Sequence, residues 1–122
     1  MTSSRSSVSP PLPWHTPLQK LDSYAAAREL ARRVHAAKIR DTELRDQATR
    51  AAKSVFLNLC EGLPHEGAAM RRRYFASALG SLHEAVGAVD LAAVIGALDA
   101  HEAALVQALG ERLRRMLLAL MR

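Results

Sequence analysis

The chain has 122 residues, of which 49% are hydrophobic and only 4% aromatic, and its formal net charge is +5. This length is typical of one domain with a single core, and the abundance of Ala and Leu favours helices over strands. The single cysteine, Cys60, excludes an internal disulfide, while the positive charge is compatible with nucleic acid or an acidic protein as partner.

Residues 1–15 are rich in Ser and Pro and show no apolar periodicity, so we expect a disordered tail ahead of a helical domain over residues 16–122. This stretch lacks the apolar run of a signal peptide, and no later segment has the length and hydrophobicity of a membrane span. We therefore expect a cytoplasmic protein with no membrane contact.

Two helices are predicted in the first half of the domain. Thr16 followed by Pro17 is typical of a helix start, and the first helix is expected to run to about residue 40. Its apolar face consists of Leu21, Tyr24, Ala27, Ala31 and Val34. After a break at residues 40–42, the second helix carries Leu44, Ala48, Ala51, Val55 and Leu59. Gly62, with Pro64 beyond it, predicts where the second helix ends.

Two further helices complete the domain. The third is expected over residues 68–95, with a main apolar stripe of Phe75, Leu79, Leu82, Val86 and Val89. The fourth begins at Asp99, which together with Glu102 three residues later resembles a capping box. It continues with Leu105, Leu109, Leu113, Met116 or Leu117, and Leu120. Four long helices with short connections predict an all-α, up-and-down antiparallel four-helix bundle.

The third predicted helix carries fewer charges than a surface helix usually does. Between Tyr74 and residue 98 its ionisable side chains are His83, Glu84 and Asp90. A second stripe is small at every step (Ala78, Ser81, Ala85, Ala88 and Ala92), and a third contains Gly80, Glu84 and Gly87. This pattern favours a ring-like homo-oligomer with the third helix at its centre. The alternative is a helix buried within one bundle, with Ala as filler.

The sequence lacks the spacings of a metal site or an active site. No Glu is followed by His three residues later, as in di-iron bundles, and Cys and His are too few for a zinc site. Cys60 lies near an apolar stripe, and the glycines do not form a phosphate-binding loop. We expect no enzymatic activity, no metal and no cofactor.

Asn58 and Glu61 place an amide and a carboxylate on or beside the apolar face of the second helix. Buried polar groups are stable only when they are hydrogen-bonded, so such residues tend to form satisfied sets. We expect a structural polar network of Asn58, Glu61, Ser81 and Glu84. Such a network would fix the register between helices, either within one chain or between subunits.

Basic residues at the start of the third helix indicate an anionic partner. Arg71, Arg72 and Arg73 lie in its first turns, where the helix dipole disfavours cations. Solvation of a charged surface explains this cluster equally well. Other basic residues share faces of the first two helices: Arg28 with Arg32, and Arg50 with Lys53. The predicted partner is therefore RNA or DNA. Because aromatic side chains that could stack on bases are scarce, we expect contacts to phosphates rather than to bases. The alternative is a protein-interaction scaffold that binds an acidic partner protein.

Two segments, SVFLNLCEG at residues 54–62 and RRRYFASALGSLHEA at 71–85, resemble a known family. This is the four helix bundle protein family, first noted as open reading frames in intervening sequences of bacterial 23S ribosomal RNA genes. The positions that match its pattern are Ser54, Leu57, Asn58, Glu61, Gly62, Phe75 or a neighbour, Ala78, Gly80, Ser81, Leu82 and Glu84. The chain departs from the pattern at Phe56, where proline is common, and at Cys60, where alanine is common.

The resemblance implies an all-helical protein without catalysis, with relatives that assemble as pentameric rings. The chain is also similar in architecture to the accessory variability protein of diversity-generating retroelements, a basic pentamer that works with a reverse transcriptase and nucleic acid. The resemblance therefore implies a homopentamer and an accessory role in RNA or retroelement processes. A reverse transcriptase or another acidic protein is then a candidate partner.

Overall fold

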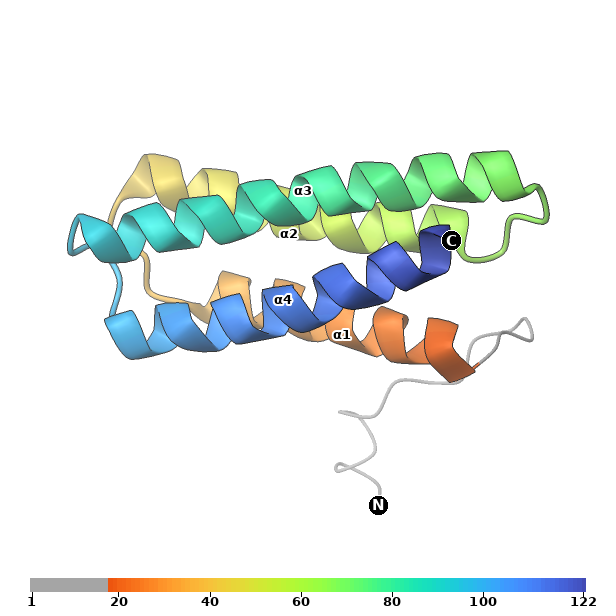
Figure 1. Cartoon of the computed structure of the whole chain (residues 1–122). Coiled ribbons are helices and arrows are strands. Elements are labelled where there is room, and N and C mark those ends of the chain that lie inside the picture. The colour runs from red at the N-terminus through yellow and green to blue at the C-terminus, as the bar shows by residue number, and fades with distance from the viewer. Residues whose placement is uncertain (1–17) are drawn as a thin grey trace, which may run out of the picture.

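The computed structural model describes residues 18–122, and within this range the chain forms four α-helices and no strand (Figure 1). They are α1 (Leu18–Ala36), α2 (Thr42–Gly62), α3 (Ala68–Val94) and α4 (Ala100–Met121). Successive helices run in opposite directions, and the α2–α3 pair lies over the α1–α4 pair (Figure 1). The prediction of an all-α, up-and-down four-helix bundle is confirmed. The tail at 1–15 and the helix start at Thr16 and Pro17 lie outside the described residues.

The core lies between the two pairs of helices and consists of one buried stripe from each helix. On α2 the buried residues include every predicted position: Leu44, Ala48, Ala51, Val55 and Leu59. On α4 they are Ala103, Val106, Gly110, Leu113 and Leu117, at alternating steps of three and four residues. The prediction that Leu105 belongs to this stripe is wrong, because Val106 takes the buried position and Leu105 is 38% exposed. On α1, the fully buried Leu30 was missing from the predicted face.

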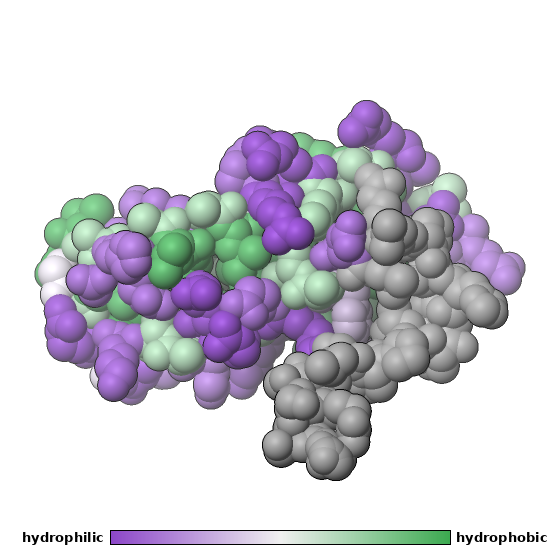
Figure 2. Space-filling view, turned by 90° about the horizontal axis from the view of Figure 1, so that it is seen from below, coloured by the Kyte–Doolittle hydropathy of each residue, from purple (hydrophilic) through white to green (hydrophobic). Residues whose placement is uncertain are grey.

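The side of the bundle formed by α1 and α4 is mixed in character. Hydrophobic surface is visible there between hydrophilic side chains (Figure 2). Leu105 and Leu118 contribute to the apolar surface of α4, since they are 38% and 39% exposed, respectively. None of the helices within residues 18–122 has the length and hydrophobicity needed to cross a membrane.

The connection between α1 and α2 begins earlier than predicted. α1 ends at Ala36, and residues 37–41 are not helical. Ala37 and Ile39 are nevertheless buried, so the apolar pattern continues past the end of the helix. The backbone N–H of Arg40 donates to the carbonyl of Ala97, at 2.8 Å, and so ties this connection to the one between α3 and α4. Asp41 caps α2, since its carboxylate accepts a hydrogen bond from the N–H of Leu44 at 2.9 Å.

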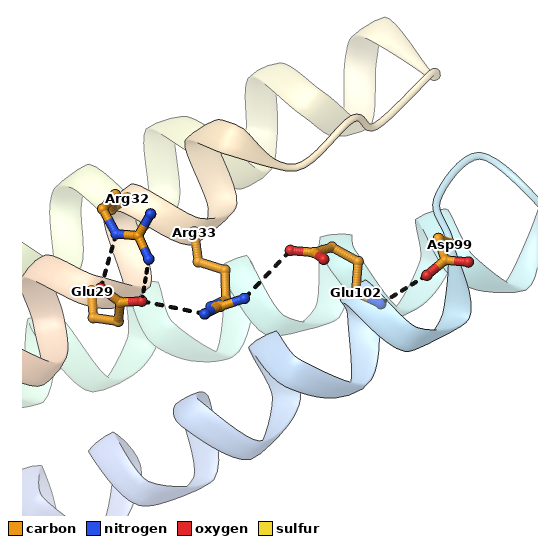
Figure 3. Close-up of polar contacts among 5 residues, drawn as sticks. All are labelled: Glu29, Arg32, Arg33, Asp99 and Glu102. Carbon is orange, nitrogen blue, oxygen red and sulfur yellow. Dashed lines mark hydrogen bonds and ion pairs between the residues drawn. The ribbon is translucent and has the colours of Figure 1, made fainter.

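Asp99 caps α4 as predicted, since its carboxylate accepts a hydrogen bond from the N–H of Glu102 at 3.1 Å. The Glu102 carboxylate lies 3.6 Å from the guanidinium of Arg33 and so links α4 to α1 (Figure 3). Arg33 also contacts Glu29, one turn earlier on its own helix. Figure 3 shows these contacts running from α1 to the start of α4, which joins the two helices on the surface of the bundle.

The small-residue stripe of α3 lies inside the bundle. Ala78, Ala85, Ala88 and Ala92 are all buried within the single chain. α2 and α3 are the most closely packed pair of helices, and Ser81 of the stripe touches Ser54 of α2. Alanine as filler within one bundle therefore explains this stripe, and the predicted oligomer has to rest on other parts of α3. The third stripe, with Gly80 and Gly87, remains exposed.

Glycines have two different roles at the ends of α2 and α3. Gly96 has φ +77°, the left-handed conformation in which a helix commonly ends. Gly62 does not have a positive φ and is the last residue of α2 rather than the residue beyond it. A Cβ at Gly62 would lie 2.8 Å from Cε1 of Phe75 and 3.0 Å from Cβ of Tyr74. Gly62 is therefore required for the close approach of α3, and the prediction that α2 ends at this residue is confirmed.

Candidate nucleic-acid interface

The three arginines at the start of α3 have different surroundings. Arg71 is half-buried, and its Nη1 donates to the carbonyl of His65 at 2.7 Å and to that of Glu66 at 3.1 Å. Arg71 therefore holds the loop between α2 and α3 in place. The side chains of Arg72 and Arg73 are exposed and make no hydrogen bond or ion pair with any described residue. These two are free to contact a ligand.

The start of α3 has a positive electrostatic potential. Its N-cap, Gly67, supplies no side-chain acceptor, and the first turn contains no acidic residue. The N–H groups of this turn and the helix dipole both favour an anion at this position. Glu61 and Glu66 are exposed at the same end of the bundle and oppose this potential. Arg72 and Arg73 are the side chains that make this end of the bundle attractive to a phosphate.

The predicted basic residues of α2 are also free. Arg50 and Lys53 are exposed and make no ion pair with a described residue. They line a shallow hollow of about 430 Å³ together with Ser54, Leu57, Asn58 and Glu61. The hollow combines two cations with one carboxylate, so it is a weaker site for a polyanion than the start of α3.

The two predicted basic residues of α1 differ in whether they have a counter-ion. Arg28 is exposed and unpaired among the described residues. Arg32 donates through Nε and Nη2 to the two carboxylate oxygens of Glu29, at 2.9 and 2.6 Å (Figure 3). The hydrogen bond from Arg32 is the main reason that the pKa of Glu29 lies below its ordinary value. Arg32 thus has its own counter-ion, which argues against its predicted contact with phosphate.

The sequence-based list also left out other free cations, including two arginines. Arg45 and Arg112 are exposed and unpaired within the part of the chain that is described. Arg112 has no acidic residue three or four positions away, and this spacing could have identified it. Arg45 has Asp41 four residues before it, but the Asp41 carboxylate is occupied by capping α2.

Asn58 and Ser81 belong to one hydrogen-bonded chain, through a residue that was not predicted. The amide nitrogen of Asn58 donates to the carbonyl of Ser54 at 2.9 Å and to its Oγ at 3.1 Å. The hydroxyls of Ser54 and Ser81 lie 2.7 Å apart, which joins α2 to α3. The position of Ser54, one turn before Asn58, could have indicated it.

Glu61 and Glu84 do not join this chain of hydrogen bonds within the monomer. Both are exposed, and neither side chain bonds to a described residue. A carboxylate on the surface remains hydrated and needs no partner, which removes the physical reason for a four-residue network inside one chain. Within one chain, the hydrogen-bonded set is Ser54, Asn58 and Ser81, and a role of Glu61 and Glu84 between subunits stays a prediction.

Two observations concern the metal-binding and nucleophilic side chains of the described residues. No group of three or more His, Cys, Asp and Glu among residues 18–122 could hold a metal ion. Burial, and secondarily the charge of Glu61, raises the pKa of the Cys60 thiol. Because the thiolate is the reactive form, Cys60 is a poor nucleophile near neutral pH.

Comparison with known proteins gives one family. The family model described as 23S rRNA-intervening sequence protein matches residues 19–119, a range that includes nearly all of the four helices. A search of curated proteins finds no match to the chain.

Proposed function

The chain belongs to the 23S rRNA-intervening sequence protein family, and from this premise we propose that it is a non-catalytic, basic, oligomeric protein that binds nucleic acid through phosphate contacts. The observation that carries the proposal is the start of α3, where Arg72 and Arg73 are exposed without counter-ions. Arg71 supports them by fixing the preceding loop. The proposed role is that of an accessory factor in RNA or retroelement processes, in company with a reverse transcriptase.

Self-association strengthens binding to a polyanion. We favour a homopentamer, in which five copies at +5 each carry a formal net charge of +25. Exposed Gly80 and Gly87 support close approach of a second chain to α3, since a Cβ at either would meet nothing within 4 Å. Several low-affinity phosphate sites in one assembly also gain from multivalency along a single nucleic acid strand.

A salt titration with arginine variants tests the proposal. Binding of a labelled mixed-sequence RNA is measured by fluorescence anisotropy between low and moderate salt, for wild type, Arg72→Ala/Arg73→Ala and Arg32→Ala. Each lost phosphate contact lowers the slope of log K against log salt by about 0.7 on a single strand. We expect a smaller slope and weaker binding for the double variant, and little change for Arg32→Ala because Glu29 already neutralises that side chain. Equal slopes for the three proteins contradict the proposal.

A scaffold that binds an acidic protein is the second candidate. It is favoured by three exposed apolar side chains at the far end of α3: Leu91, Val94 and Ile95 are 48%, 74% and 54% exposed. Exposed apolar groups of this size are typical of protein contacts. Competition between RNA and an acidic polypeptide for the protein distinguishes the two functions. If RNA fails to displace the bound acidic polypeptide, the result favours the scaffold.

A further inference from the structure

From position 47 onwards the exposed side of α2 changes from basic to acidic, whereas the start of the helix exposes Glu43, Arg45 and Asp46. Among exposed residues between positions 47 and 66, the charged ones are Arg50, Lys53, Glu61 and Glu66. The two cations precede Leu57 and the two anions follow it. None of the four side chains makes a hydrogen bond or ion pair within the described part of the chain. Lys53 and Glu61 are about 12 Å apart along the helix axis, so they cannot pair with each other within one chain.

An apolar side chain marks the midpoint of this face. Leu57 is 61% exposed, although it lies well inside a long helix. Lys53 and Glu61 lie four residues before and after it, on the same side of the helix. The neighbouring helix, α3, leaves this face accessible. Ser81 of α3 contacts Ser54 of α2, and the residue before it, Gly80, has open space around it.

We infer that this face of α2 binds the same face of a second copy of the chain, in an antiparallel contact with two-fold symmetry centred on Leu57. In this arrangement Leu57 of each copy meets Leu57 of the other, and Lys53 of each copy lies opposite Glu61 of the other. In the same register Arg50 lies opposite position 64 of the second copy, two residues before Glu66, which follows the end of α2. A parallel arrangement would instead place Lys53 opposite Lys53, so the charges select the antiparallel one.

A second copy suits this face better than nucleic acid does. A polyanion would gain from Arg50 and Lys53 but would be repelled by Glu61 and Glu66. A second copy pairs Lys53 with Glu61 twice and covers Leu57 of both copies at once. The inference rests on the self-association in the proposed function and specifies one face that carries it. If the chain forms a ring, the two-fold contact joins two rings. If it does not, the contact joins two monomers into a dimer. The molar mass doubles in both cases.

Charge reversal tests the contact. The molar mass is measured by light scattering over a range of concentrations for wild type, Lys53→Glu, Glu61→Lys and the combined Lys53→Glu/Glu61→Lys. Each single reversal places like charges opposite each other twice in the two-fold contact, and the combined variant restores both pairs. From the usual strength of exposed ion pairs we expect each single variant to associate about tenfold or more weakly, with half the wild-type mass. The combined variant should recover the wild-type mass.

Matched controls separate this contact from general effects of charge and hydrophobicity. Arg45→Glu reverses an exposed, unpaired cation elsewhere on α2, and Leu118→Asp changes a leucine of α4 that is 39% exposed. Both should retain the wild-type mass, whereas Leu57→Asp should halve it, and circular dichroism verifies that every variant is folded. This inference is overturned if the single reversals leave the molar mass of the oligomer unchanged, or if the combined variant does not recover the wild-type mass. Neither result contradicts the proposed oligomer. A wild-type monomer at all concentrations overturns both.

Discussion

Replacement of Gly62 by alanine measures how tightly α2 and α3 approach each other. The new Cβ would lie 2.8 Å from Cε1 and 3.1 Å from Cδ1 of Phe75, and 3.0 Å from Cβ of Tyr74. Carbon atoms are in favourable contact at about 3.5–4.0 Å, so the neighbours must move by roughly half an ångström or more. The Phe75 ring is completely buried, and the Tyr74 Cβ is fixed to the backbone, so neither group can rotate away.

The expected destabilisation is the difference between two terms. Overpacking of a well-packed core costs about 1–3 kcal/mol. Alanine recovers up to about 1 kcal/mol relative to glycine in a helix, because its unfolded state has less conformational freedom. With about 1 kcal/mol recovered, the net loss for Gly62→Ala is about 0–2 kcal/mol. In a domain of this size, each kcal/mol of lost stability lowers Tm by roughly 4 °C.

Urea denaturation followed by circular dichroism gives the free energy of unfolding for this variant and for a matched control. Gly80→Ala introduces the same methyl group on the exposed side of α3, where nothing lies within 4 Å of the new Cβ. At a protein concentration where the chain is monomeric, the control should be more stable than wild type by about 0.5–1 kcal/mol. The reasoning is refuted if Gly62→Ala gains stability as the control does.

Three further predictions concern the polar residues. Arg71→Ala should lower the free energy of unfolding by about 1–2 kcal/mol, since it removes two hydrogen bonds to loop carbonyls, whereas Arg72→Ala should change it by less than about 0.5 kcal/mol; urea titration of the pair checks the difference. Asn58→Leu should cost about 1 kcal/mol by removing the amide that bonds two oxygens of the previous turn, and Glu61→Ala should leave the Tm of the monomer nearly unchanged because its side chain is exposed and unpaired. Finally, the pKa of Glu29 is lowered from 4.5 on folding, so its contribution to stability is present above pH 4.5 and is lost as the pH falls through the lower folded value. Acid unfolding followed by circular dichroism should show a smaller loss of stability for Glu29→Gln than for wild type, and equal losses contradict this reasoning.

Much of the fold could be predicted because local signals and the apolar pattern agree. Asp99 caps α4 through a side-chain contact three residues along the chain, which is visible in the sequence. The end of α1 was placed too late, because Ala37 and Ile39 continue the apolar pattern while their burial depends on the other helices. The stripe of α4 was placed partly on Leu105, because leucine is common on both sides of that helix and Val106 is smaller.

The candidate interface was less predictable, because it depends on which charges are already paired. The sequence shows three consecutive arginines at 71–73 as equivalent, but two loop carbonyls occupy Arg71 in the folded chain. The stripe of small residues on α3 is compatible with an oligomer or with burial in one bundle, and only the position of α2 shows that the stripe is already covered within the chain. Pairing of this kind depends on tertiary structure and cannot be read from helical spacing.

The two ends of the bundle differ in how freely they can open. At one end, both the backbone N–H and the guanidinium of Arg40 donate to the connection after α3, at the carbonyls of Ala97 and Gly96. At the other end lie the start of α1, the end of α4 and the single loop between α2 and α3 (Figure 1). Local separation of the α1–α4 pair from the α2–α3 hairpin is therefore easiest at that second end, where Arg72 and Arg73 lie. A ligand held by these arginines and by a neighbouring helix would suppress this breathing motion and protect the amides of the open end from hydrogen exchange.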